Sequence, residues 1–309
     1  MRGDEIKRML LKFNTARRIV QLFSFILFSA IVFNLGVLPF LLPVVWTWGL
    51  PQNTVGDAFT AMQLTFYSAL VPWLAFAAFL ITGIIIGKSL CGWVCPFGFI
   101  QDLIGFIKRK KMEISPRTHG TLLYIKYGIL GFALFISVTF AASKLMGLQA
   151  GYESALGVFV KAPFAAVSPA ETLFGTIPGM ILNFRNTIVD RAVYDVLASS
   201  ITSLPLLFWA QLVILIIALV IIAFVPRGFC KYFCPHGAIM AIMNRFSFIG
   251  LHREPTKCTK SGCRLCVEAC PMRVPILDLP WEKFSHEECI YCMKCADACD
   301  NKAIKLKYP

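Results

Sequence analysis

Four long apolar stretches dominate the hydrophobic pattern of the chain; they cover residues 19–45, 66–87, 122–142 and 204–225. Each can cross a hydrocarbon core of roughly 30 Å, which takes about twenty residues in a helix. Four such stretches in 309 residues argue against a soluble protein with buried core helices. The first stretch is too long for a secretory signal and has no small-residue cleavage site. The pattern predicts an α-helical integral membrane protein with four transmembrane helices.

Positive charges gather at one end of the predicted spans. Lys and Arg are frequent before residue 19, between residues 88 and 117, and after residue 226, whereas residues 46–65 contain none. Because cytoplasmic loops carry the excess of Lys and Arg, we expect a multi-pass protein with both termini and the C-terminal tail in the cytoplasm. The formal net charge of +13 then follows one side of the bilayer. We therefore expect membrane lipid, and no nucleic acid, as its counterpart.

Composition supports this interpretation and leaves the cysteines to be explained. Only 15% of the residues are charged and 57% are hydrophobic, whereas a soluble domain has about 25% charged residues. The twelve cysteines fall into two groups, one at the predicted membrane boundary and one in the tail.

The boundary cysteines belong to a repeated motif. Residues 89–101 read S-L-C-G-W-V-C-P-F-G-F-I-Q, and residues 228–240 read G-F-C-K-Y-F-C-P-H-G-A-I-M. Both contain C-x3-C-P-x-G after an apolar span, which indicates a duplicated two-helix unit. Soft thiolates bind zinc, copper(I) or iron–sulfur centres, so the repeat is a candidate third metal or iron–sulfur site; packing is the alternative, since disulfides are disfavoured in the cytoplasm. Its ligands would be Cys91, Cys95, Cys230 and Cys234.

The tail cysteines follow the bacterial ferredoxin pattern. Cys258-x4-Cys263-x2-Cys266-x3-Cys270-Pro271 precedes Cys289-x2-Cys292-x2-Cys295-x3-Cys299. In two-cluster ferredoxins the fourth cysteine of each run binds the other cluster. We therefore expect one [4Fe–4S] cluster on Cys258, Cys263, Cys266 and Cys299, and a second on Cys289, Cys292, Cys295 and Cys270.

Two departures from the ferredoxin pattern and one alternative metal qualify this assignment. The first run has four residues between its leading cysteines, which makes Cys258 the weakest ligand assignment. Asp300 replaces the proline after Cys299, which we expect to weaken that turn but not the ligation. Zinc is the alternative, although its ribbons seldom show two complete runs of this kind.

These features divide the chain into three regions. Residues 1–226 form the four-span membrane domain with the first C-x3-C-P motif, and residues 227–252 hold the second motif and a linker. Residues 253–309 form a small C-terminal two-cluster ferredoxin-like domain in the cytoplasm, whose folding we expect cluster binding to drive.

The order of spans, boundary motifs and two-cluster tail resembles the membrane ferredoxin-type quinol dehydrogenases of the NapH type. Relatives of that family include the membrane half of the NosR regulator and the cytochrome oxidase accessory ferredoxin. The resemblance covers nearly the whole chain and implies a protein of the bacterial or archaeal cytoplasmic (inner) membrane. It implies electron transfer from the quinol pool through iron–sulfur clusters to a partner reductase, ferredoxin-type protein or multihaem cytochrome subunit. It carries over the eight tail cysteines as ligands and the four boundary cysteines as the family's motif.

Several other residues are candidates for proton or charge chemistry. The apolar loop 143–203 is a candidate wall for a hydrophobic quinol, and Glu153, Glu171, Asp190 and His236 are candidate proton carriers, although each is equally an ordinary structural residue. Lys126 either compensates charge near the boundary cysteines or extends to the lipid headgroups. Cations among the tail ligands would raise a cluster's potential; they are Lys257, Lys260, Arg264, Arg273 and Lys294.

Quinol oxidation is the function that the sequence favours, with two alternatives. An assembly factor would use the same clusters to reduce a metal before its insertion. A redox sensor or docking subunit of a larger membrane complex would use the tail without catalysis.

Overall fold

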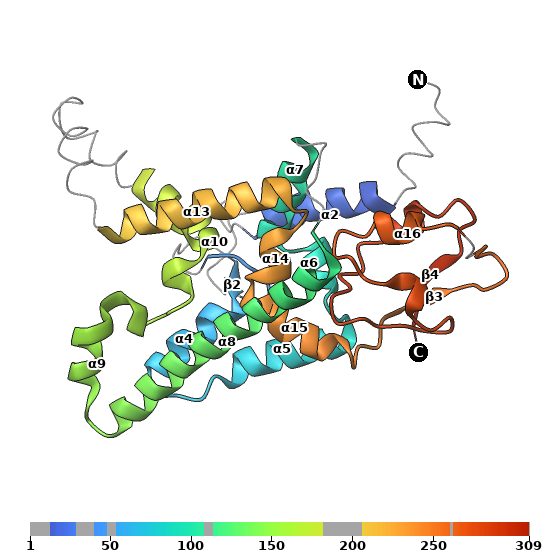
Figure 1. The fold of residues 1–309 in the computed structure, drawn as a ribbon. Helices are drawn as coiled ribbons and strands as arrows, with labels where there is room; N and C mark the ends of the chain where they lie inside the picture. The colour runs from blue at the N-terminus through green and yellow to red at the C-terminus, as the bar shows by residue number, and fades with distance from the viewer. Residues whose placement is uncertain are drawn as a thin grey trace, which may run out of the picture.

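A computed structural model describes residues 13–28, 40–47, 54–107, 114–181, 206–259 and 262–308. Helices predominate in these ranges and form an elongated body with the tail at one end (Figure 1). The body contains α2 (Phe13–Leu27), α4 (Ala58–Tyr67), α5 (Trp73–Ile85), α6 (Ser89–Trp93), α7 (Pro96–Ile107), α8 (Pro116–Leu145), α9 (Gln149–Leu156), α10 (Pro169–Glu171), α13 (Leu206–Phe224), α14 (Gly228–Tyr232) and α15 (Pro235–Asn244). Strands β1 (Phe40–Leu42) and β2 (Val55–Asp57) pair in parallel beside them.

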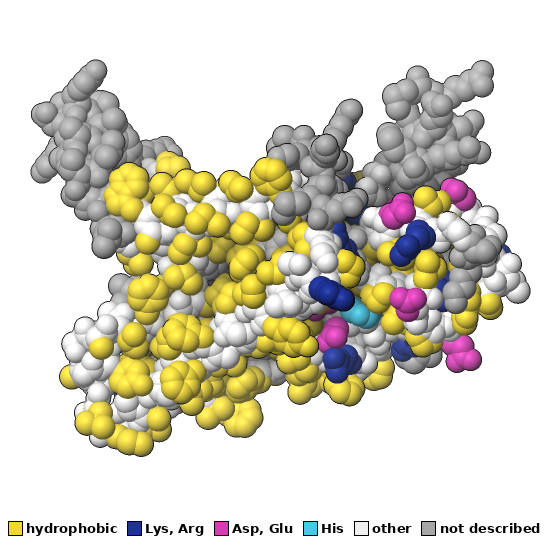
Figure 2. All heavy atoms as spheres, viewed as in Figure 1, with side chains coloured by type: hydrophobic (Ala, Val, Ile, Leu, Met, Phe, Trp, Pro, Cys, Tyr) yellow, Lys and Arg dark blue, Asp and Glu magenta, His cyan; other side chains and the backbone are white. Residues whose placement is uncertain are grey.

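Helices α8 and α13 have the length and composition of membrane spans. Only 33% and 22% of their most apolar windows are buried, whereas a core helix of a soluble protein is mostly buried. Their exposed apolar side chains form part of the hydrophobic surface that Figure 2 shows over the body. Helix α8 contains the whole predicted span 122–142, and α13 lies inside the predicted span 204–225.

The other two predicted spans differ from the structure. Helix α2 ends at Leu27, and β1 begins at Phe40, so residues 19–45 do not form one continuous helix. Pro39 and Pro43 flank this strand, and proline cannot continue a helix because it lacks a backbone donor. Residues 66–87 are divided between the end of α4 and the 13-residue α5, with Pro72 at the break. The prediction was wrong on continuity because apolar composition hides such breaks.

Helix α2 has an inverted amphipathic pattern. Its buried residues are Arg17, Gln21 and Ser24, while Leu22 and Phe23 are at least half exposed. In water a helix buries its apolar stripe. Helix α2 instead exposes apolar side chains, as suits a lipid environment, and buries polar side chains against the rest of the body. Arg17 and Gln21 make that contact with α6 and α7.

The tail has its own small core at one end of the body. Strand β3 (Gly250–Arg253) pairs antiparallel with β4 (Ile304–Lys307), with Gly250 opposite Lys307. Short helices α16 (Leu265–Glu268) and α17 (Lys294–Asp297) lie beside this sheet (Figure 1). The tail core starts at Ile249 and also includes Cys91 from α6, so the tail packs directly on the first boundary motif.

Candidate metal centres

Two cavities in the tail are each lined by four cysteines. The outer cavity, of about 200 Å³, is lined by Cys258, Cys263, Cys266 and Cys299. A narrower inner cavity is lined by Cys270, Cys289, Cys292 and Cys295. These are the same two sets that the ferredoxin spacing predicts, including the exchange of the fourth cysteine between the runs.

The two cavities differ in exposure. Cys263 in the outer set is exposed, whereas Cys289, Cys292 and Cys295 in the inner set are buried. The buried guanidinium of Arg253 and the side chain of Lys257 line the outer cavity. The outer cavity is therefore the more exposed of the two, while the inner cavity faces the body.

The turns after the two fourth cysteines have the same geometry. Arg273 and Lys302, each three residues after its cysteine, have left-handed φ angles of 57° and 50°. The next backbone N–H donates to the cysteine sulfur at 3.4 Å in both turns, from Val274 to Cys270 and from Ala303 to Cys299. The turn after Cys299 therefore has the same geometry without proline as the turn after Cys270 has with it; its strength stays a prediction.

The donor arrangement distinguishes a cluster from a single ion. In the described part of the chain, no three His, Cys, Asp or Glu side chains are placed to hold one metal ion. Four thiolates on one zinc ion at about 2.3 Å would lie within about 4 Å of one another. A cubane spreads its four ligands over four corners, so four cysteines around a cavity fit a [4Fe–4S] cluster. When bound, such a cluster accepts and releases one electron.

Tail and body meet at the first boundary motif. A Cβ atom on Gly92 would lie 2.2 Å from the backbone oxygen of Ile290, so only glycine admits the tail backbone here. The indole N–H of Trp93 donates to the Tyr291 carbonyl at 2.8 Å. The amide of Asn244 donates to the carbonyl of Cys289 at 3.0 Å. The inner cysteine loop is thus bonded to both α6 and α15.

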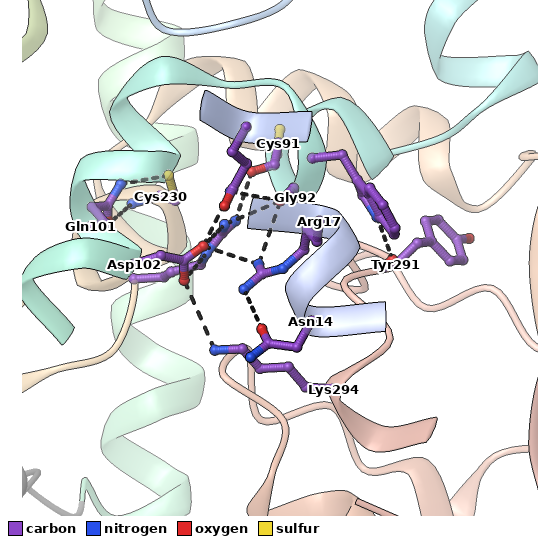
Figure 3. A network of polar contacts seen from close by, with 12 residues as sticks. Asn14, Arg17, Cys91, Gly92, Gln101, Asp102, Cys230, Tyr291 and Lys294 are labelled. Atoms are coloured by element: carbon purple, nitrogen blue, oxygen red, sulfur yellow. Dashed lines mark hydrogen bonds and ion pairs between the residues drawn. The ribbon is translucent and has the colours of Figure 1, made fainter. Parts of the chain in front are cut away.

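A buried ion-pair network surrounds Asp102 beside this contact (Figure 3). Arg227 and Arg17 pair with its carboxylate at 2.5 and 3.0 Å, and Lys294 of the tail approaches it at 3.9 Å. Arg227 also donates to the Cys91 carbonyl at 2.7 Å. The network connects α2, both boundary motifs and the tail.

A second buried network surrounds Glu288, next to the inner cysteine loop. Lys88 pairs with one carboxylate oxygen at 2.8 Å, and Lys126 pairs with the other. Burial opposes the charged carboxylate, but the two ammonium groups lower the pKa of Glu288 to about 2. Lys126 is fully buried, so it does not extend to the lipid headgroups; its ion-pair partner is the Glu288 carboxylate of the tail, and compensation of charge near the boundary cysteines stays a prediction.

Three of the four predicted proton carriers lie in described parts of the chain. His236 is fully buried and bonds to Asp57 through Nε2 at 2.7 Å, while its Nδ1 has no partner among the described residues. Glu171 accepts a hydrogen bond from Thr47 at 2.8 Å, and Glu153 is exposed. Asp190 lies outside the described residues. His236 and Glu171 thus form hydrogen bonds with different residues, Asp57 and Thr47.

A large apolar cavity lies between α8 and α13. Its volume is about 690 Å³, and its wall includes Phe229 and Phe233, which directly precede Cys230 and Cys234 in sequence. Phe164, Val167 and Pro169 of the long loop also line the cavity, and none of the candidate proton carriers that the structure describes does. The lining residues are Ile125, Gly128, Ile129, Phe132, Phe164, Val167, Pro169, Ile214, Ile217, Ala218, Ile221, Phe229 and Phe233.

Comparison with known protein families agrees with this arrangement. A 4Fe-4S binding domain model matches residues 67–113 and again residues 207–252, the two halves of the duplicated unit. A 4Fe-4S dicluster domain model matches residues 257–304, the tail. The matched relatives include ferredoxin-type NapH. The chain fits the NapH-type family of ferredoxin-type proteins.

Relatives of this NapH-type chain align over much of its length. NapH of Haemophilus influenzae is 25% identical over 71% of this chain and 62% of its own length. The methylamine utilization ferredoxin-type protein MauN of Methylobacillus flagellatus is 22% identical over 94% and 88%. An uncharacterized protein of Methanocaldococcus jannaschii is 28% identical over 73% and 74%. No solved structure matches the chain. The matches support an iron–sulfur electron-transfer protein.

Sequence reasoning missed the buried charges of this NapH-type chain. Lys88 and Arg227 occupy the same position, three residues before the first cysteine of each motif. That repeated basic residue is the signal that identifies them. Their partners Asp102 and Glu288 carry no such signal, because each is distant in sequence from its cation.

Proposed function

We propose that this chain is the membrane-embedded electron-transfer subunit that oxidises quinol and passes the electrons through two tail [4Fe–4S] clusters to a partner redox protein. The observation that carries the proposal is the pair of four-cysteine cavities, one against the body and one exposed. Quinol releases two electrons and two protons, and each cluster accepts one electron, so two centres in series suit this substrate.

The direction of transfer follows from the different exposure of the two sites. The inner set lies against the first boundary motif of the body, which supports it as the site that receives electrons from quinol. The exposed Cys263 in the outer set is where a reductase or multihaem cytochrome would collect electrons. The exposed apolar faces of α8 and α13 support membrane embedding, with both termini on the cytoplasmic side by the distribution of Lys and Arg.

The apolar cavity between α8 and α13 supports quinol as the donor. Its wall is apolar throughout and lies between the two longest apolar helices, as an isoprenoid substrate requires. Gly128 lines this cavity, and a Cβ atom there meets no atom within 4 Å, so a larger side chain would enter the free space.

Reduction of the purified protein by menaquinol tests the proposal. Excess menaquinol should reduce the tail clusters, followed by electron paramagnetic resonance, with dithionite as the positive control. Gly128→Leu should slow this reduction at least tenfold, whereas Gly131→Leu, on the same helix with equal free space but outside the cavity, should not. Clusters that dithionite reduces and menaquinol does not would exclude quinol oxidation and favour the assembly-factor alternative.

A further inference from the structure

The four boundary cysteines have no role in the tail cavities, yet all four are buried. Their exposed fractions are 6% for Cys91, 1% for Cys95, 5% for Cys230 and 2% for Cys234. Contacts between the two motifs bring the pairs together: Gln101, which follows Cys95 on α7, donates to the Cys230 sulfur at 2.8 Å, and Arg227 donates to the Cys91 carbonyl at 2.7 Å. Cys95 and Cys234 also belong to the same buried core. The duplicated unit thus brings both cysteine pairs to one place.

The local geometry of the two motifs is the same. A Cβ atom on Gly98 would lie 3.0 Å from the Cys91 carbonyl oxygen, and one on Gly237 would lie 2.9 Å from the equivalent carbonyl. In the second motif the sulfur of Cys234 accepts the backbone N–H of Gly237 at 3.4 Å. Each glycine lets its helix approach the preceding cysteine turn and directs a backbone donor at sulfur, an arrangement that stabilises thiolate.

Two buried cations occupy equivalent positions beside these cysteines. Lys88 and Arg227 are each 1% exposed and each precede the first cysteine of a motif by three residues. Arg227 adopts a left-handed φ of 52°, a strained conformation for a side chain of this size. Burial of a charge costs stability unless the charge is paired, and the two cations pair with Glu288 and Asp102 respectively.

The buried carboxylates do not balance the buried cations at this interface. Five cations there are at most 1% exposed, whereas two buried carboxylates, Asp102 and Glu288, face them, an excess of three positive charges. Lys231, one of the five, has no carboxylate partner in the described ranges. The five are Arg17, Lys88, Lys126, Arg227 and Lys231.

The structure assigns Cys91, Cys95, Cys230 and Cys234 as the ligands of a third [4Fe–4S] centre, with Lys88 and Arg227 as its charge-compensating residues. Iron binding takes the thiols in their deprotonated form, so the resulting anionic centre, like the inner tail cluster, would add negative charge to this cationic interface. Cys91 packs in the same core as Cys289 and Cys292, so the centre adjoins the inner tail site. The assignment deepens the proposed function, but its test uses no quinol.

Metal analysis of the anaerobically purified full chain is the decisive measurement. We expect about twelve iron and twelve acid-labile sulfide per chain, four for each of three clusters. The double variant C91S/C230S should lose one third of the iron and keep both tail signals in electron paramagnetic resonance. The control C263S should disturb the outer tail signal and keep the third one. About eight iron in the wild-type chain, or one zinc or copper in place of the third cluster, would overturn the assignment.

The role of the buried cations is tested separately, by the midpoint potential of the third centre. Removing a nearby positive charge with Lys88→Met should lower this potential, whereas Lys88→Arg should keep it close to the wild-type value. Lys144→Met is the matched control, because Lys144 bonds to the Tyr67 carbonyl at the far end of α8. An unchanged potential in Lys88→Met would show that this lysine serves only the fold.

Discussion

Gly92→Ala tests whether the tail depends on its contact with the first boundary motif. The new Cβ would lie 2.2 Å from the Ile290 carbonyl oxygen, whereas an ordinary contact begins at 3.4 Å. The obstruction is backbone, which no rotamer change can move aside. The inner cysteine loop must therefore withdraw by about 1 Å, and overpacking of this kind costs about 1–3 kcal/mol.

This displacement also stretches the hydrogen bonds around the contact. Trp93 Nε1 donates to the Tyr291 carbonyl at 2.8 Å, and Gln21 donates to the Gly92 carbonyl at 3.0 Å. Loss of one such bond adds about 1 kcal/mol. We therefore expect local opening of residues 289–293 to become 10- to 1000-fold more frequent, which corresponds to about 1.4–4 kcal/mol.

Hydrogen exchange of the tail amides in detergent or nanodiscs measures this opening. Gly105→Ala is the matched control, because a Cβ there meets no atom within 4 Å; it should leave tail exchange unchanged. Tail exchange equally slow in Gly92→Ala and Gly105→Ala would refute the inference that tail and body are in close contact at this glycine.

Three further predictions concern the same interface. Asp102→Asn leaves two buried guanidinium groups without a carboxylate, so we expect a loss of about 3–5 kcal/mol, seen as a lower thermal midpoint. Burial alone would raise the pKa of Asp102, but Arg227 and Arg17 lower it below 3.8; its stabilisation is therefore full above about pH 4 and is lost as the pH falls further. The difference in thermal midpoint between the wild-type chain and Asp102→Asn should therefore shrink below pH 4. A difference that stays constant with pH would contradict the ion-pair account. Trp93→Phe should cost about 1 kcal/mol by the same melt. Iron chelation should make the tail protease-sensitive before the body, and simultaneous loss of both would contradict separate tail folding.

The sequence was most informative where chemistry requires a fixed spacing. The exchange of Cys270 and Cys299 between the two runs follows from ferredoxin spacing, and each cavity contains the expected set. Spacing is a local property that one sequence displays in full. The helical character of residues 122–142 and 204–225 was also predictable, because long apolar runs leave few alternatives.

Contacts between distant residues could not be predicted in the same way. Lys126 and Glu288 are 162 positions apart, and neither has a neighbour that indicates its partner. Helix α2 shows the same limit, since its polar stripe is visible in sequence but its burial depends on α6 and α7. Breaks inside apolar stretches were missed because hydropathy averages over proline.

The duplicated unit raises the question of how one tail docks on two similar motifs. The motifs differ at the position after the first cysteine, which is Gly92 in one and Lys231 in the other. Glycine in the first motif admits the backbone of the inner cysteine loop. In the second motif the ammonium of Lys231 faces the tail instead: burial raises the pKa of Cys270, and this ammonium opposes the rise. A lysine in the first motif would block the loop, and a glycine in the second would remove a positive charge beside a cluster ligand. The difference between Gly92 and Lys231 at equivalent positions therefore allows the tail to dock on the duplicated unit in one orientation, in which the inner cysteine set contacts both motifs.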